Sequence, residues 1–252
     1  MNVKIIIVIV IAALCFVPIG AAEQYYIELH PTEDSYVESE NPGTNYGGSN
    51  YLYSDTDIWN YYYPNEYKRS YLKFDLSEIP VETDITTTII SANLKLYVNS
   101  IGDQSVDVGV YQSPSTWNEG TIIWNNAPSV STPVIDIVTI VHDDTGYEWN
   151  VKDDIQDMIG NDISFMVKSE RTEYGYEYLS FRSREYYYED KDPTLKVTYT
   201  LSCNTPDCPD CPDGERVPGD VNGDGKVNIG DAVLLFNWVS FPNERGTTYI
   251  LR

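Results

Sequence analysis

Residues 24–201 show an alternation of inward-facing and polar side chains with a period of two, in one segment after another. Successive side chains of a β-strand point to opposite faces of its sheet, so each run predicts a strand with one buried and one solvated face. The inward members of these runs are Leu72, Phe74 and Leu76; Ile90, Ala92, Leu94, Leu96 and Val98; Val106, Val108 and Val110; Ile163, Phe165 and Val167; Leu179, Phe181 and Ser183; Leu195, Val197, Tyr199 and Leu201. Turn-forming sequences such as Asn41-Pro42-Gly43 separate them. We therefore expect an all-β domain over residues 24–201, a β-sandwich of the jelly-roll type.

One helix is predicted inside this domain. Val151, Ile155 and Ile159 fall on one helical face, Asp153 lies in the first turn, and Gly160 follows as a terminator. We expect this single helix to cap one end of the sandwich.

The N-terminus predicts export. Lys4 precedes an almost unbroken apolar run over residues 5–17, and Gly20-Ala21-Ala22 supplies the small residues that signal peptidase recognises. The run is shorter than the ~20 residues that span a bilayer, so a cleaved signal peptide (residues 1–22) is favoured over a membrane anchor. We expect a secreted or extracellular protein, free or associated with the cell surface, with no membrane span in the mature chain.

The chain is strongly acidic, with 39 acidic and 16 basic residues and a net charge of −23. Nucleic acids and anionic membranes are bound by clustered Lys and Arg, and the sequence contains no such cluster. We therefore expect neither as a partner. The chain also has 22 tyrosines, which suit strands and amphipathic contact surfaces alike.

Composition changes abruptly after residue 201. Residues 202–218 are rich in Pro, Asp and Cys and predict a linker. Three of the four cysteines, Cys203, Cys208 and Cys211, lie in it. An odd number leaves one spare thiol, so a local disulfide or an intermolecular bond is favoured over half of a zinc site.

Residues 220–231 predict a calcium-binding loop of the EF-hand type. Calcium prefers six to eight oxygen ligands, and such a loop supplies them from positions 1, 3, 5, 7, 9 and 12. These positions are Asp220, Asn222, Asp224, the main-chain carbonyl of Lys226, Asn228 and Asp231. Gly225 permits the sharp turn at position 6, and Asp231 replaces the usual Glu at position 12.

The loop and the apolar helix expected after it resemble half of a dockerin module, over residues 219–252. Dockerins attach secreted proteins to cohesins, so the resemblance implies a cohesin-like protein partner. The partner-binding positions of that family correspond here to Ile229, Gly230, Phe236 and Asn237. Dockerins carry two such repeats, and one half buries too little apolar surface to be stable by itself. It therefore folds on another chain, pairs with its own copy in self-association, or is a truncated remnant.

Several short segments of the predicted sandwich occur in a familiar order. They are residues 30–37 (HPTEDSYV), 45–47 (NYG), 69–76 (RSYLKFDL), 92–97 (ANLKLY), 117–121 (WNEGT), 124–128 (WNNAP) and 181–185 (FRSRE). Together they resemble the DNRLRE-type domains of secreted bacterial and archaeal proteins, including those associated with disaggregatase. The resemblance implies a jelly-roll sandwich that binds carbohydrate, since some members are carbohydrate-binding modules for acidic polysaccharides such as alginate.

The residues themselves are compatible with sugar binding. Pyranose rings stack on aromatic faces, and uronate carboxylates pair with Lys and Arg. The sequence offers two aromatic clusters and four basic positions expected on or beside one outward sheet face. They are Trp59, Tyr61, Tyr62 and Tyr63; Tyr186, Tyr187 and Tyr188; and Lys73, Lys95, Arg182 and Arg184. The alternatives are tyrosines packed on the sandwich rim and ordinary surface salt bridges.

Three other features bear on function. Asp34 and Glu185 are candidate ligands of a second, structural calcium ion, and Trp117 and Trp124 are assigned to the core. The chain has two histidines and no nucleophile elbow, zinc motif or phosphate loop. We therefore expect a non-catalytic accessory protein that binds polysaccharide. The alternatives are a structural or adhesive surface protein with a protein partner, and a polysaccharide-degrading lyase or hydrolase.

Overall fold

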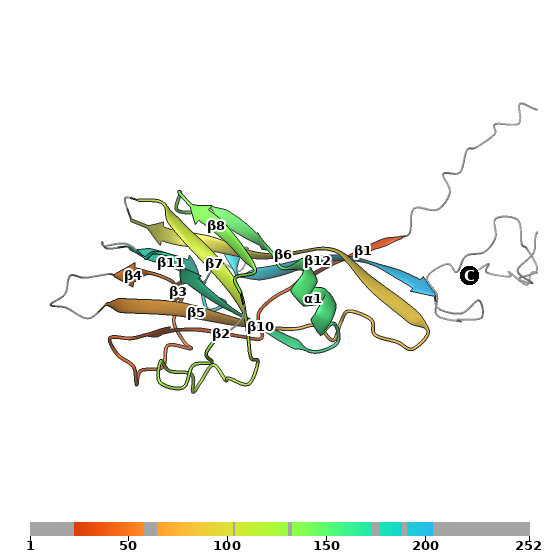
Figure 1. Ribbon diagram of the computed structural model, residues 1–252, viewed down its shortest axis with the longest axis horizontal. Helices are drawn as coiled ribbons and strands as arrows, with labels where there is room; N and C mark the ends of the chain where they lie inside the picture. Colours follow the sequence, from red (N-terminus) through yellow and green to blue (C-terminus); the bar gives the residue numbers. More distant parts are fainter. Residues whose placement is uncertain are drawn as a thin grey trace, which may run out of the picture.

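The computed structural model describes residues 23–57, 65–102, 104–130, 133–172, 177–187 and 191–203. Within these ranges the chain forms two antiparallel six-stranded sheets and one short helix (Figure 1). The predicted all-β fold is confirmed, and its architecture is a β-sandwich. The signal peptide, the linker from residue 204 onward and the calcium loop lie outside the described residues and remain predictions. No helix in the described part of the chain is long and apolar enough to cross a membrane.

The first sheet is built around one long strand, β6 (Ile85–Ile101). Its other strands are β1 (Gln24–Leu29), β12 (Thr194–Cys203), β11 (Leu179–Arg182), β3 (Tyr51–Tyr53) and β9 (Gly146–Asn150). The order is β1-β12-β6-β11-β3, and β9 also pairs with β6. Lys95 of β6 pairs with Thr194 of β12 and with Glu148 of β9, so these two strands flank β6 on opposite sides.

The second sheet has the order β2-β5-β10-β7-β8, with β4 paired to β5. Its strands are β2 (Glu33–Glu38), β4 (Thr56–Asp57), β5 (Glu66–Asp75), β7 (Val106–Ser113), β8 (Asp136–Ile140) and β10 (Asp162–Ser169). Its edge strand β2 lies next to β3 of the first sheet. The two sheets therefore come together along this side of the sandwich.

The inner faces of the two sheets share one hydrophobic core. Most of the predicted inward residues lie in it, but Leu201 is only partly buried against it, Ser183 is buried outside it, and the prediction for Ile90 is wrong. Ile90 is 41% exposed, whereas Ile89 is 1% exposed and packs in the core. The pairing of β12 with β6 shifts register between Thr198 and Tyr199, so that Tyr199 pairs with Ile89. Such a bulge changes which residues of a strand face inward, and the simple alternation misses it.

The predicted helix is α1 (Lys152–Met158), and it packs mainly on β6. Ile155 is buried, Asp153 and Asp154 lie in the first turn, and Gly160 has a positive φ of 79° just after the helix. Only glycine adopts that backbone conformation without strain.

A second, smaller hydrophobic cluster lies on the outer face of the β2-β5-β10 sheet. The loop of residues 114–130 folds over this face and inserts Trp117 and Ile122 against Val37, Tyr71 and Met166. The indole nitrogen of Trp117 donates a hydrogen bond of 2.7 Å to Ser164, so this ring belongs to the core as predicted. Trp124 is only half-buried at the margin of this cluster.

Candidate functional site

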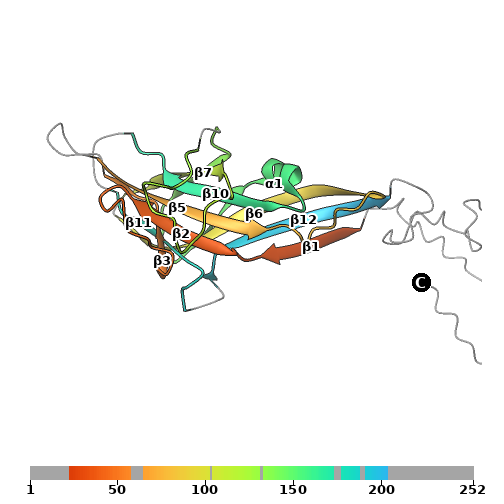
Figure 2. The same ribbon diagram turned by 90° about the horizontal axis from the view of Figure 1, so that it is seen from below.

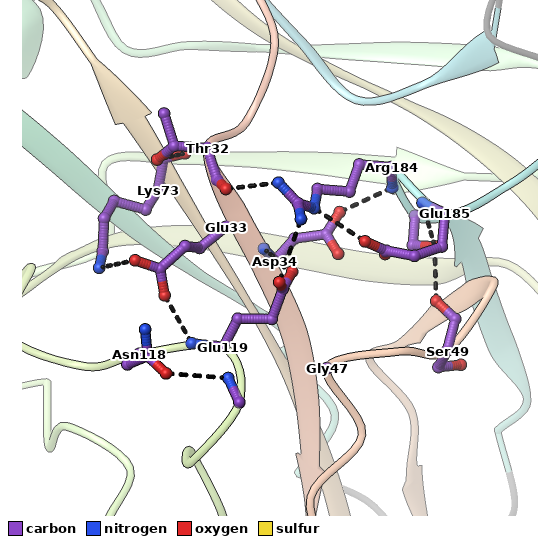
Figure 3. Close-up of polar contacts among 12 residues, drawn as sticks. Thr32, Glu33, Asp34, Gly47, Ser49, Lys73, Asn118, Glu119, Arg184 and Glu185 are labelled. Carbon is purple, nitrogen blue, oxygen red and sulfur yellow. Dashed lines mark hydrogen bonds and ion pairs between the residues drawn. The ribbon is translucent and has the colours of Figure 1, made fainter.

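Three carboxylates from distant parts of the chain meet beside the edge strand β2 of the sandwich. They belong to Asp34 on β2, Glu119 in the 114–130 loop and Glu185 in the turn after β11. One oxygen of each lies within 4.8 Å of the corresponding oxygens of the other two. Figure 3 shows the three side chains converging, and we call them the carboxylate cluster.

Asp34 is held deep inside the cluster. It pairs with Leu72, a core residue, so its side chain points between the sheets and is 1% exposed. Its Oδ2 accepts a hydrogen bond of 2.9 Å from the backbone amide of Arg184. Its own amide donates to Oε1 of Glu119 at 3.0 Å. The edge strand, the loop and the turn are thus joined through this one residue.

The backbone around Glu119 is fixed by the neighbouring loop of residues 41–49. Asn45 donates from its side-chain amide to the carbonyl oxygens of Glu119 and Ile122, each at 2.7 Å. A Cβ atom at Gly47 would lie 2.4 Å from the carbonyl oxygen of Glu119. This close approach requires glycine at position 47.

The turn that carries Glu185 is closed by Ser183. Its hydroxyl donates to the carbonyl of Ser49 at 2.6 Å and accepts from the amide of Glu185 at 3.2 Å. Its carbonyl accepts from the amide of Tyr186 at 3.1 Å. A serine that bonds to backbone two residues on is a common turn device, and here it directs Glu185 toward Asp34.

Arg184 is the cation of the cluster. Its guanidinium donates to Glu185 Oε1 at 2.8 Å, to Glu119 Oε2 at 3.1 Å and to the carbonyl of Thr32. Three carboxylates and one guanidinium leave a formal charge of −2 when all are ionised. The predicted sugar-binding residue Arg184 therefore serves this cluster, with its side chain about one third exposed.

The electrostatics of the cluster follow from its burial. Burial raises the pKa of Asp34 well above its usual value, and the Glu185 carboxylate adds to this, although the Arg184 amide opposes it. Burial also raises the pKa of Glu119. Burial alone would raise the pKa of neighbouring Glu33 too, but hydrogen bonds from Lys73 and the Glu119 amide outweigh it and lower that pKa. Glu33 is thus charge-balanced, whereas the cluster is not.

Lys73 requires a correction. It lies on the outer face of β5, as predicted, but the 114–130 loop covers it and leaves it 5% exposed. Its ammonium donates to Glu33 at 2.8 Å and to the carbonyl of Trp117 at 2.6 Å, and lies 4.8 Å from the centre of the Trp117 ring. Lys73 therefore anchors the loop and is not available to a sugar.

The basic positions also do not form one strip. Lys73 belongs to the second sheet, whereas Lys95 and Arg182 lie on the outer face of the first. Lys95 is half-buried and donates to the hydroxyl of Tyr97 at 2.7 Å. Arg182 is 6% exposed, and its guanidinium lies 4.7 Å from the centre of the Tyr186 ring.

Around Arg182 the structure assembles a mixed aromatic and charged surface, which we call the Arg182 face. Tyr186 lies against Tyr187 with ring centres 4.6 Å apart and the rings tilted by 31°, and Tyr187 is 67% exposed. Tyr51, which pairs with Arg182 across β3 and β11, lies 5.8 Å from Tyr186 between ring centres. Arg182 and Tyr187 were predicted from the sequence as sugar-binding residues, but Tyr51 was not, because its place beside them depends on strand pairing.

One carboxylate already lies on the Arg182 face. Asp144 accepts hydrogen bonds from Arg182 and, at 3.2 Å, from Lys191. The hydrogen bonds from Lys191 and Arg182 lower the pKa of Asp144, and the bond from Lys191 has the larger effect. Asp144 is therefore ionised near neutral pH. Asp144 and Lys191 carried no local sequence signal, since neither lies in a motif or in an alternating run.

The remaining predicted site residues lie outside the described residues. They are Trp59, Tyr61, Tyr62 and Tyr63 of the first aromatic loop, Tyr188, and all positions of the tail loop and its partner-binding helix. Of the two predicted ligands of a second calcium ion, the structure brings Asp34 and Glu185 together. The structure adds Glu119 as a third carboxylate. This residue lies in the WNEGT segment of residues 117–121, and nothing in the sequence indicated that it is a metal ligand.

The model of carbohydrate-binding module family 96 matches residues 25–199. No curated protein matches the chain significantly.

Proposed function

Because the chain belongs to carbohydrate-binding module family 96, we propose that its sandwich binds an acidic polysaccharide through the Arg182 face. We further propose that the protein is secreted and non-catalytic. In this proposal the sandwich is the sugar-binding part, and the C-terminal tail is a separate assembly element.

The contact between Asp144 and its two cations carries the proposal. Arg182 and Lys191 hold one carboxylate between them at the protein surface. The Asp144 side chain is 65% exposed and that of Lys191 32%, whereas the Arg182 side chain is only 7% exposed, so a ligand reaches Arg182 by displacing Asp144. A uronate carboxylate has the same chemistry as Asp144 and can replace it on these two cations. Charge-assisted hydrogen bonds of this kind favour an acidic sugar over a neutral one.

The aromatic pair beside these cations supplies the apolar half of a sugar site. Tyr187 presents an exposed ring that rests on Tyr186, and Tyr186 in turn lies on the Arg182 guanidinium. Tyr186 therefore restricts the Tyr187 ring, and Arg182 restricts Tyr186. Little side-chain conformational entropy is then lost when a pyranose ring stacks on Tyr187. Tyr186 thus links the exposed Tyr187 ring to the Arg182 guanidinium, and this places aromatic stacking and carboxylate binding on one face.

The test is calorimetric titration of the full chain with polygalacturonate, alginate and neutral dextran. We expect saturable binding of the acidic polymers only. Tyr187→Ala should weaken it about 10-fold, a typical effect of losing one stacked ring at ~1.4 kcal/mol. Tyr26→Ala is the matched control, since Tyr26 is 60% exposed on β1 of the same sheet. Equal losses in both variants, or none in either, would contradict the proposed site.

A second variant tests the role of Asp144. Asp144→Asn removes a competing carboxylate, so we expect tighter binding of polyuronates and no change in the response to dextran. Weaker polyuronate binding would mean that Asp144 itself contacts the sugar.

We propose for the tail that Asp220, Asn222, Asp224, Lys226, Asn228 and Asp231 bind calcium and order the helix that follows. That helix would then dock on a cohesin-like protein or on a second copy of the chain. Asp220→Ala together with Asp224→Ala should remove one calcium ion per chain and leave polysaccharide binding unchanged. Unchanged calcium stoichiometry would contradict the proposed loop.

A further inference from the structure

We infer that the carboxylate cluster of Asp34, Glu119 and Glu185 is a calcium site inside the sandwich, separate from the tail loop. The inference depends on the contacts of the cluster and not on sugar binding.

The charge of the cluster calls for a divalent cation. Arg184 neutralises one of three carboxylates whose oxygens lie within 4.8 Å of one another, which leaves −2 beside β2 and the turn after β11 when all three are ionised. Uncompensated charge in such a place is costly. The adjoining pair of Glu33 and Lys73 is neutral by itself and supplies nothing further. One divalent ion would balance the remainder.

Two oxygens of the cluster are also left without a donor. Oδ1 of Asp34 and Oε2 of Glu185 are buried, and neither has a hydrogen-bond partner among the described residues. Asp34 is 1% exposed, so bulk water does not solvate its free oxygen. Buried polar atoms are nearly always paired. Both atoms belong to the carboxylates that converge in Figure 3, and a shared cation would satisfy both.

The geometry and the donor type fit calcium. Oxygens on opposite sides of a calcium ion lie about 4.6–5.2 Å apart, given Ca–O distances of 2.3–2.6 Å. Ligand oxygens within 4.8 Å of one another can therefore surround one such ion. The three donors of the cluster are carboxylates, which suit a hard cation and not the nitrogen and sulfur sites typical of zinc.

The competing explanation is a proton shared between Asp34 and Glu185. A buried carboxyl pair can hold one proton in place of a metal ion, and the raised pKa of Asp34 is compatible with either. A shared proton would satisfy the two free oxygens but would leave Glu119 and Arg184 as a simple ion pair. It would also make the cluster indifferent to calcium, and that difference is measurable.

The ion would join three segments that are far apart in the sequence. Asp34, Glu119 and Glu185 are separated by 85 and 66 residues, and Glu185 directly precedes Tyr186 and Tyr187. If the proposed function is right, calcium at the cluster also fixes the turn that presents the stacked tyrosines. The metal site stands without that consequence.

The experiment starts from the full chain with Asp220→Ala and Asp224→Ala, so that the tail loop cannot contribute. After treatment with EDTA and its removal, calcium chloride is titrated by calorimetry. We expect one calcium ion per chain. Glu119→Gln and Glu185→Gln, added separately, should each weaken this binding at least 10-fold, because each removes a charged ligand while keeping the shape. Glu78→Gln is the control, since Glu78 is exposed and outside the cluster.

A second measurement does not depend on the cluster variants being folded. In the chain with the silenced tail loop, 5 mM calcium should raise Tm above its value in EDTA, and sodium chloride of equal ionic strength should not. Absence of bound calcium and of this Tm shift would overturn the inference and favour the shared proton. Calcium binding that both Gln variants leave intact would overturn it as well. Polyuronate titration in EDTA, run in parallel, separates failure of the metal site from failure of the proposed function.

Discussion

Replacing Lys73 by Met tests whether this residue holds the 114–130 loop or contacts a ligand. The ammonium group makes an ion pair with Glu33, a hydrogen bond to the Trp117 carbonyl and a close contact with the Trp117 ring. Removing one partner of a fully buried pair costs about 3–5 kcal/mol. The Glu33 side chain is 24% exposed, and water therefore compensates part of the loss. We expect Lys73→Met to lower the free energy of unfolding by about 2–3 kcal/mol.

Urea denaturation followed by tryptophan fluorescence measures this loss, and thermal melting should show a Tm lower by about 4–12 °C. Lys196→Met is the matched control, because Lys196 makes a surface ion pair with Glu148. That variant should change stability by less than about 1 kcal/mol. Polyuronate affinity, measured below the melting range, should be unaffected by Lys73→Met. Weaker affinity at unchanged stability would refute the assignment of Lys73 to the loop.

Three further predictions follow from particular contacts. Ile89→Ala should cost about 2–4 kcal/mol and Ile90→Ala less than about 0.5, because the bulge at Ile90 of β6 buries the first residue and exposes the second; equal urea midpoints for the two variants would contradict the register. Gly47→Ala should cost about 1–3 kcal/mol, because the new methyl group meets the Glu119 carbonyl, and a Tm equal to that of the parent would show that the loop shifts freely. Burial raises the pKa of Asp55 despite the nearby Lys68, so the protonated form favours folding, and this contribution is lost as pH rises through the folded-state pKa. Lys68→Met should raise that pKa further, and an unchanged carboxyl titration by NMR would rule this out.

Local pattern was sufficient for the helix and for six of the twelve described strands, β5, β6, β7, β10, β11 and β12. The alternation around Leu72, Phe74 and Leu94 reports burial of one face, and that property does not depend on which strand is the neighbour. Ile90 is the exception, because its exposure is caused by a register shift that belongs to the pairing of β6 with β12 and not to β6 itself.

The functional residues were less accessible to such reasoning. Lys73 lies on the outer face of its sheet, as the alternation predicts. Its side chain is nevertheless buried, because a loop more than 40 residues away in the sequence covers it. Asp144 and Tyr51 join Arg182 only through tertiary contacts. Asp34 and Glu185 were singled out as metal ligands, yet the third carboxylate, Glu119, needed the folded loop to be recognised.

The pairing of β1 with β12 has a mechanical consequence. Gln24 pairs with Thr200, so the chain enters and leaves the sandwich at the same end, where Figure 2 shows the two strands side by side. Tension between the two termini therefore separates β1 from β12 by breaking their hydrogen bonds one pair after another, because these bonds lie perpendicular to the strands. Tension between the C-terminus and a ligand held on another strand acts along β12 and loads its ten paired positions on β6 together. The domain should therefore resist shear far better than peeling, and under the proposed function this would suit a module anchored by its tail and pulled by its ligand.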